Sequence, residues 1–310
     1  MLNRVPKCGS QSTFGFMRHA PVESDISVDI CTTDDRHYLR DNLLRSPDKL
    51  EEYRSNPTKF VCDKKQKKDK KYIVAGHYFY TPPHPDHKDD MDNFNMVREP
   101  ISRCQSRFYY GVGRGELPEM IFEECISSGL CLLPDISTIP GYENKGYGEL
   151  VKEQKEAKRV ELEGLGYKGE VLGSMMVMAE ECSSNHQTRI MCGMQEVCYR
   201  GTQDEVLEEA KRVAAEQYEV IGTTDRIPET LWVLNNVYPS FFGELRKWSY
   251  YQAPCSHCPS VFSSSRPEIL PAHQTLLEEI NRGDVELIRF VNDLLTMKHV
   301  ACQRRIDQES

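Results

Sequence analysis

The sequence has no stretch that approaches the roughly 18–20 consecutive apolar residues of a membrane-spanning helix, and it shows no signal-peptide pattern. It also lacks an acceptable N-glycosylation sequon, because the Asn-x-Thr match at Asn56 has Pro57 in its middle position. That absence weighs mildly against a glycosylated luminal protein. The G-x-x-x-x-G-K-[ST] signature is missing as well, which argues against the phosphate loop of nucleotide triphosphatases.

Positive charge is not in excess either. The 310 residues carry 39 Lys and Arg against 48 Asp and Glu, a net charge of −9, so binding of a polyanion requires a local basic patch. The lysine-rich run Asp63–Lys71 is a candidate, although most such runs are solvated loops. With 39% hydrophobic and 28% charged residues, the length suffices for one large α/β domain or two small ones.

The stretch Asn3–Ser12 reads as the end of a strand, a tight turn with a lysine, and the start of a helix. Such a turn points unpaired backbone N–H groups at one spot, at the positive end of a helix dipole, and this arrangement binds phosphate. Lys7 adds a mobile positive charge, and Ser10 and Ser12 add hydroxyl donors. An ordinary basic turn before a helix is the other interpretation of this stretch alone.

A second stretch, 95–110, again predicts strand, turn and helix, with Pro100 suited to the first helical turn. Arg98 leaves the end of the strand and Ser106 lies two turns along the helix, so we expect both to reach one phosphate. A third stretch, Tyr72–Gly76, predicts a short apolar strand with His77 directly at its end. Ligands of parallel α/β sheets bind at the carboxyl ends of strands, where a catalytic residue is expected.

The 12 cysteines divide by their spacing. Cys125 and Cys131 bracket a short loop, and so do Cys192 and Cys198. Neither pair has the C-x2-C spacing of zinc sites, so we predict two local disulfides in a secretory compartment. Cys255–Cys258 does have that spacing, but no second half of a zinc site is evident.

Periodicity predicts most of the later elements. Thr202–Glu205 is a capping box that opens a helix, Tyr218–Gly222 is a strand, and 228–237 is a helix. Two more helices are expected at 271–281 and 284–299. The segment 133–181, rich in Gly, Lys and Glu, contains one possible helix at 147–162.

The stretches N-R-V-P-K-C-G-S and V-R-E-P-I-S-R-C-Q-S-R-F-Y-Y together resemble those of the cytosolic and Golgi sulfotransferases. They look most like the uronyl and heparan sulfate 2-O-sulfotransferases, with the arthropod Pipe type as the nearest subtype. V-A-G-H-Y-F-Y resembles the catalytic histidine segment of that family, and I-F-E-E-C resembles its F-D-E-C segment. The resemblance spans most of the chain.

This resemblance implies an α/β fold, with a P-loop-like central parallel sheet flanked by helices, as a single domain over 1–310. It implies transfer of a sulfuryl group from 3′-phosphoadenosine 5′-phosphosulfate to the 2-hydroxyl of a uronic acid in a glycosaminoglycan such as heparan or dermatan sulfate. Neither a metal nor a nucleic acid is required. The family consists of type II membrane proteins of the Golgi lumen, so we expect this sequence to be truncated at its N-terminus, without the anchor, the stem and part of the first strand. A soluble relative is the alternative interpretation.

Roles follow from the resemblance residue by residue. Lys7 is expected to neutralise charge on the bridging oxygen, and His77 to act as the general base. Arg98 and Ser106 are expected to hold the 3′-phosphate. The 5′-phosphate is expected on the loop residues Lys7, Cys8, Gly9, Ser10, Gln11 and Ser12. Arg4 and Arg114 are candidates for the carboxylate or sulfate of the substrate, with a plain exposed arginine as the equal alternative.

The chain departs from the family pattern at three places. Ala75 stands where the heparan sulfate enzyme has a second histidine. The loop 248–265 is rich in Cys and Ser where the family has Arg and Lys. Segment 133–181 has no counterpart, so we interpret it as a surface insertion or a gene-model artefact that does not belong to the fold.

Two other classes of protein compete with the enzyme. A sulfotransferase-like protein that binds sulfated polysaccharide without transferring sulfate is favoured by Ala75 and by the altered loop. A nucleotide kinase is disfavoured, because Cys8 stands where a magnesium-binding Ser or Thr is needed.

Overall fold

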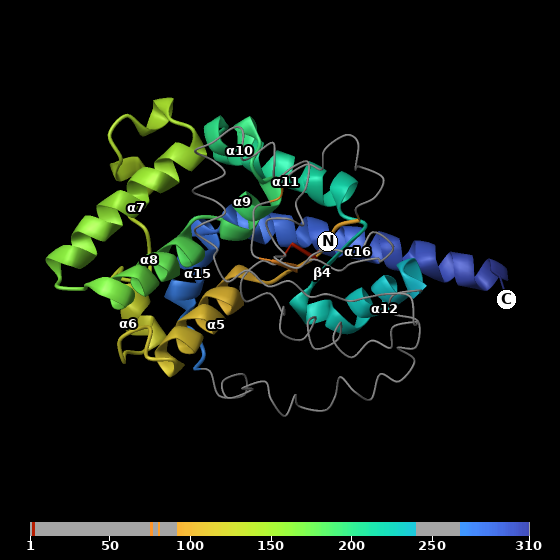
Figure 1. Cartoon of the computed structure of the whole chain (residues 1–310), viewed down its shortest axis with the longest axis horizontal. Helices are drawn as coiled ribbons and strands as arrows, with labels where there is room; N and C mark the ends of the chain where they lie inside the picture. Colours follow the sequence, from red (N-terminus) through yellow and green to blue (C-terminus); the bar gives the residue numbers. More distant parts are fainter. Residues whose placement is uncertain (1, 4–74, 77–79, 81–91, 240–266, 310) are drawn as a thin grey trace, which may run out of the picture. The chain divides into compact units, whose positions relative to one another are not determined.

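The computed structural model describes residues 2–3, 75–76, 80, 92–239 and 267–309 of the chain, and they fall into two compact units (Figure 1). The first unit draws on Met1–Val97, Arg212–Pro259 and Arg289–Ser310. The second unit draws on Arg98–Lys211 and Ser260–Ile288. Each unit therefore combines segments that are far apart in the sequence.

The first unit contains a parallel sheet of four strands in the order β2-β1-β3-β4. Its strands are β1 (Leu2–Asn3), β2 (Ala75–Gly76), β3 (Phe94–Val97) and β4 (Val220–Thr223). Every residue of β3, an inner strand, and of β4, the edge strand beside it, is buried, as is typical of parallel sheets in α/β proteins. The predicted α/β class with a parallel sheet is therefore confirmed.

One helix packs on β4 at very close range. Helix α12 (Ile227–Val237) follows β4 through a short 3-10 turn, Thr224–Arg226. A side chain at Gly222 would collide with Thr230 of that helix, so the strand can carry only glycine there without displacing the helix. The predicted strand and the helix after it are both confirmed, within two residues at their ends.

The second unit is built from helices. They are α5 (Pro100–Gly113), α6 (Phe122–Ser127), α7 (Tyr147–Gly164), α8 (Gly169–Ser183), α9 (His186–Cys192), α10 (Glu196–Arg200) and α15 (Pro271–Ile280). Helix α8 packs against both α5 and α7 (Figure 1). Two long helices, α11 (Gln203–Gln217) and α16 (Arg282–Glu309), contribute residues to both units.

The segment 133–181 belongs to the core of the second unit, which corrects its interpretation as a surface insertion outside the fold. Leu162 of α7 and Met175 and Met178 of α8 have no exposed surface and join the same apolar cluster as Phe108 of α5. The predicted helix at 147–162 is confirmed as α7.

The helices expected near the C-terminus from the local sequence are also present. At α11 the Thr202 N–H donates to the Glu205 carboxylate at 2.7 Å and the Glu205 N–H donates to the Thr202 hydroxyl at 3.3 Å, which confirms the capping box. Helices α15 and α16 are confirmed too, although α16 continues to Glu309 rather than ending at residue 299. Within the described part of the chain, no helix has the length and apolarity needed to cross a membrane.

Candidate functional site

The carboxyl ends of β1 and β2 lie at one edge of the sheet. The two strands pair in parallel, Leu2 beside Ala75 and Asn3 beside Gly76, so the chain leaves both strands at the same level. The residue after β1 is Arg4, which precedes the expected phosphate loop at Lys7, and the residue after β2 is His77. Strand β3 pairs with the other side of β1, in parallel as well, and the residue after it is Arg98.

Most of the expected site residues lie outside the described part of the chain. These are Arg4, Lys7, Cys8, Gly9, Ser10, Gln11, Ser12 and His77. The alternative zinc motif at Cys255–Cys258 and the altered loop 248–265 lie outside it too. Their assigned roles stay predictions, whereas Arg98, Ser106 and Arg114 can be placed.

The junction between β3 and α5 follows from its local sequence. Glu99 is the N-cap of α5, and its carboxylate accepts the N–H groups of Ile101 at 2.9 Å and Ser102 at 2.6 Å. Pro100 occupies the first helical position, where the missing N–H costs no hydrogen bond. Glu99 therefore ends the strand and starts the helix immediately after Arg98.

Arg98 is half-buried, and its side chain lies against the first turn of α5. Its Nε and Nη2 atoms donate to the Ser102 hydroxyl at 3.0 and 2.7 Å. Ser106, also half-buried, is one turn beyond Ser102, so the two hydroxyls share a helix face. The structure thus brings Arg98 to the face that carries Ser106, with Ser102 between them. Ser102 was not among the expected residues, although its spacing of four from both partners could have revealed it.

A different face of α5 carries two arginines that are paired inside the protein. Arg103 is fully buried; its Nη1 lies 3.8 Å from Glu181 Oε2, and its Nη2 lies 3.9 Å from Asp284 Oδ2. The Arg107 Nε lies 3.8 Å from the same Glu181 oxygen. Two buried carboxylates thus face two guanidinium groups, as buried charges require. Neither arginine is therefore offered to a ligand.

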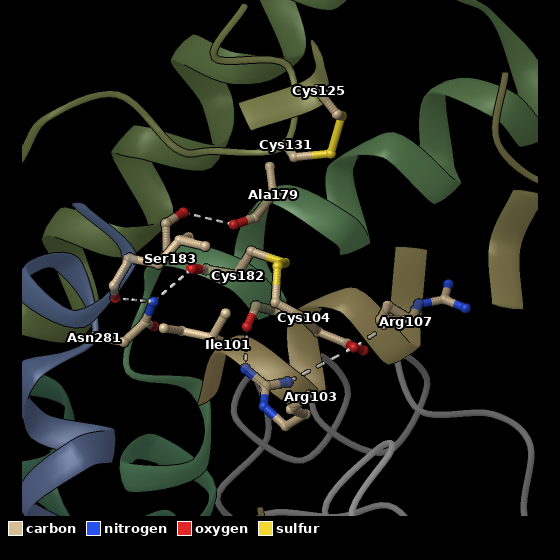
Figure 2. Close-up of a disulfide and its surroundings, with 12 residues drawn as sticks. Ile101, Arg103, Cys104, Arg107, Cys125, Cys131, Ala179, Cys182, Ser183 and Asn281 are labelled. Carbon is tan, nitrogen blue, oxygen red and sulfur yellow. Dashed lines mark hydrogen bonds and ion pairs between the residues drawn. A yellow bond between two sulfur atoms is a disulfide. The ribbon is translucent and has the colours of Figure 1, made fainter. Parts of the chain in front are cut away.

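Within the described residues there are three disulfides, and all of them are in the second unit. Both predicted bonds, Cys125–Cys131 and Cys192–Cys198, are present. The third, Cys104–Cys182, was not predicted and joins α5 to α8 over 78 residues of chain. Figure 2 shows it directly beside Arg103, and Asn281 Nδ2 donates to the Cys182 carbonyl oxygen at 2.6 Å. The helix that carries Ser102 and Ser106 is thus covalently fixed in its unit.

Arg114 lies at the far end of α5 from Arg98. Its Nε lies 2.8 Å from Glu116 Oε1, its Nη1 donates to the Tyr110 hydroxyl at 2.6 Å, and its guanidinium lies over the Tyr110 ring. The 14 residues of α5 separate the two arginines by roughly 20 Å. Arg114 is therefore not part of the phosphate site around Arg98, and its contact with a glycan stays a prediction.

Metal ligands do not gather among the described residues, where no group of three or more His, Cys, Asp and Glu side chains could hold an ion. No protein-family model matches the chain, and a search of curated proteins finds no match either. The sulfotransferase resemblance therefore rests on the sequence motifs.

Proposed function

We propose that this protein is a sulfotransferase. In this proposal it moves the sulfuryl group of 3′-phosphoadenosine 5′-phosphosulfate to the 2-hydroxyl of a uronic acid in a glycosaminoglycan such as heparan or dermatan sulfate. The observation that carries the proposal is the parallel order of β2, β1 and β3. His77 and Arg98 directly follow β2 and β3, and the expected phosphate loop begins at Lys7, shortly after the end of β1.

The proposed chemistry needs positioning and charge neutralisation, as phosphoryl transfer does. His77 takes the proton of the acceptor hydroxyl while the hydroxyl oxygen forms a bond to sulfur. The bond from sulfur to the bridging oxygen breaks, and its electron pair stays on the 5′-phosphate. Lys7 neutralises that added charge, and the backbone from Cys8 to Ser12 holds the phosphate. The product that leaves is adenosine 3′,5′-bisphosphate.

Arg98 and Ser106 are assigned to the 3′-phosphate, the group that distinguishes this donor from ordinary nucleotides. The contact between Arg98 and Ser102 supports the assignment, because it holds the guanidinium on the helix face that carries Ser106. A phosphate there would meet a positive charge and two hydroxyl groups next to the N-terminus of α5. The fold class supports the proposal only coarsely, as a parallel α/β sheet.

The compartment is part of the proposal. Three disulfides in one unit are typical of proteins that fold in an oxidising compartment. A glycosaminoglycan sulfotransferase acts in the Golgi lumen, which is part of the oxidising secretory pathway. We therefore assign the protein to that lumen.

Arg98→Ala is expected to weaken binding of adenosine 3′,5′-bisphosphate by about 1–3 kcal/mol, roughly 5- to 150-fold in Kd, because a charge-assisted contact to the 3′-phosphate is lost. Binding of adenosine 5′-phosphate should barely change. Calorimetric titration with both nucleotides measures the difference. Arg114→Ala is the matched control, since it removes an exposed arginine from the other end of α5 and should alter neither affinity. Equal losses for both nucleotides in Arg98→Ala would show that this residue does not recognise the 3′-phosphate.

A non-catalytic protein that binds sulfated polysaccharide is the second candidate. The specific observation in its favour is Ala75, which occupies β2 two residues before His77, where the heparan sulfate enzyme has a second histidine. The low positive charge of 248–265 points the same way. This candidate predicts binding of heparin without any transfer of sulfate.

A further inference from the structure

Gln187 makes two hydrogen bonds to the backbone of Arg98, from a point 89 residues further along the chain. Its Oε1 accepts the Arg98 N–H at 2.8 Å, and its Nε2 donates to the Arg98 carbonyl oxygen at 2.7 Å. Gln187 belongs to α9 and has no exposed surface. Both residues belong to the second unit, so the contact lies within one compact body.

These two bonds fix the conformation of Arg98. Its N–H belongs to the peptide plane before the residue and its carbonyl to the plane after it, so holding both planes fixes φ and ψ. Fixed φ and ψ determine the direction in which the side chain leaves the backbone. A primary amide carries an acceptor and a donor on one planar group, which this two-point contact requires. An ionised carboxylate of the same size can only accept.

Asp284 determines the orientation of the Gln187 side-chain amide. This carboxylate is fully buried; its Oδ2 accepts the backbone N–H of Gln187 at 3.2 Å and lies 3.4 Å from Gln187 Nε2. Because the Asp284 carboxylate can only accept hydrogen bonds, the amide nitrogen of Gln187 must face it. The amide oxygen of Gln187 then accepts the Arg98 N–H. The other oxygen of Asp284 accepts both the N–H and the hydroxyl of Thr188 at 2.8 Å.

The position of Asp284 is itself fixed by neighbours from three elements. Its N–H donates to Asn185 Oδ1 at 3.0 Å, and Asn185 Nδ2 in turn donates to the Tyr147 hydroxyl at 3.1 Å. Burial raises the pKa of Tyr147 to about 12, so this hydroxyl stays neutral. The fully buried Arg103 guanidinium, 3.9 Å away, offsets the charge of Asp284.

We propose that Gln187 is a positioning residue for the 3′-phosphate site, which acts by holding the backbone of Arg98 in the conformation that presents its guanidinium to the phosphate. The inference rests on the proposed function, in which Arg98 recognises that phosphate. Gln187 itself touches no substrate. Asp284 orients the Gln187 amide, and the amide holds the backbone of Arg98. The backbone conformation in turn places the Arg98 guanidinium beside the Ser102 hydroxyl.

The test compares Gln187→Glu with Gln154→Glu, which makes the same chemical change at another buried glutamine of this unit. Gln154 Nε2 also donates to a backbone carbonyl, but to that of Pro134. The measured quantity is the preference for adenosine 3′,5′-bisphosphate over adenosine 5′-phosphate in calorimetric titrations. Gln187→Glu is expected to lower that preference roughly tenfold, and Gln154→Glu to leave it unchanged. A general loss of structure would lower both affinities and leave their ratio intact.

The possible results separate this inference from the proposed function. If the wild-type protein prefers the bisphosphate, Arg98→Ala abolishes that preference and Gln187→Glu retains it, the positioning role is wrong while the function stands. If the wild-type protein has no preference, the proposed function falls and the inference falls with it. Gln187→Met, which keeps the length but removes both hydrogen-bonding groups, serves as a second variant and should show the same loss.

Hydrogen exchange in the wild-type protein tests the contact without any substitution. The Arg98 amide follows the last paired residue of β3, so without Gln187 it would exchange quickly. We expect it to be protected in the absence of nucleotide. Fast exchange of this amide in the free protein would overturn the inference even if no variant folds.

Discussion

Replacement of His77 by alanine is expected to lower the rate of sulfuryl transfer by about 10²–10⁴-fold, the usual cost of removing a general base. His77 directly follows β2, and β2 pairs in register with β1, which leads into the expected phosphate loop. The imidazole is assigned to the acceptor side, so the affinity for adenosine 3′,5′-bisphosphate should remain nearly unchanged. Initial rates together with titration of the bisphosphate measure both effects.

His87→Ala is the control for this prediction, because His87 lies in the proline-rich segment 82–87 and has no assigned role. It should retain normal turnover. We expect His77 to act alone, so Ala75→His should not be needed for activity. Near-normal turnover in His77→Ala would show that the base is another group.

Loss of the disulfide between α5 and α8 is expected to have the largest effect on stability. In the loop-entropy model, the 78-residue separation of Cys104 and Cys182 corresponds to roughly 4–5 kcal/mol of unfolding free energy. The separation of 6 residues between Cys125 and Cys131 corresponds to roughly 2–3 kcal/mol. Urea unfolding of the two double alanine variants measures both values, and all four cysteines are buried, so the variants are well matched.

Two results would contradict this account of the disulfides. One is that the Cys104→Ala/Cys182→Ala variant loses no more free energy of unfolding than the Cys125→Ala/Cys131→Ala variant. The other is free thiols at these positions in secreted material, as detected by peptide mapping under non-reducing conditions. Free thiols would count against the oxidising compartment as well.

Local features of the structure could be predicted from the sequence. The Thr202–Glu205 capping box, the apolar strand at β4 and the two short cysteine loops each depend on residues only a few positions apart. Such features form wherever the local residues permit. The strand, turn and helix around Arg98 follow the same rule, because Glu99 and Pro100 lie next to it in the chain.

Contacts between distant residues could not be predicted in this way. Among 12 cysteines, spacing does not identify Cys104 and Cys182 as partners. Gln187 likewise meets Arg98 and Asp284, residues far from it in the sequence, only through packing in the folded unit. A buried glutamine that makes two hydrogen bonds to the backbone of a distant residue has no recognisable pattern in a single sequence.

The misinterpretation of 133–181 has a different cause. Its interpretation as an insertion rests on the missing counterpart in the family that the chain resembles, and its Gly, Lys and Glu content is typical of a solvated segment. Yet Met175, Met178, Ala179 and Cys182 recur at helical spacing, and all four are buried in the structure. Periodicity was the better guide here, because a helix needs only one apolar face to join a core.

The measurement that tests the central claim most directly uses 3′-phosphoadenosine 5′-phosphosulfate that is radiolabelled in its sulfuryl group. The protein is incubated with this donor and with desulfated heparin or dermatan, and the polysaccharide is then digested to disaccharides. The account predicts label at the 2-position of the uronic acid, with one adenosine 3′,5′-bisphosphate released for each sulfate transferred. Binding of sulfated chains without any incorporation of label would contradict it and would identify the protein as a polysaccharide-binding relative of the enzymes.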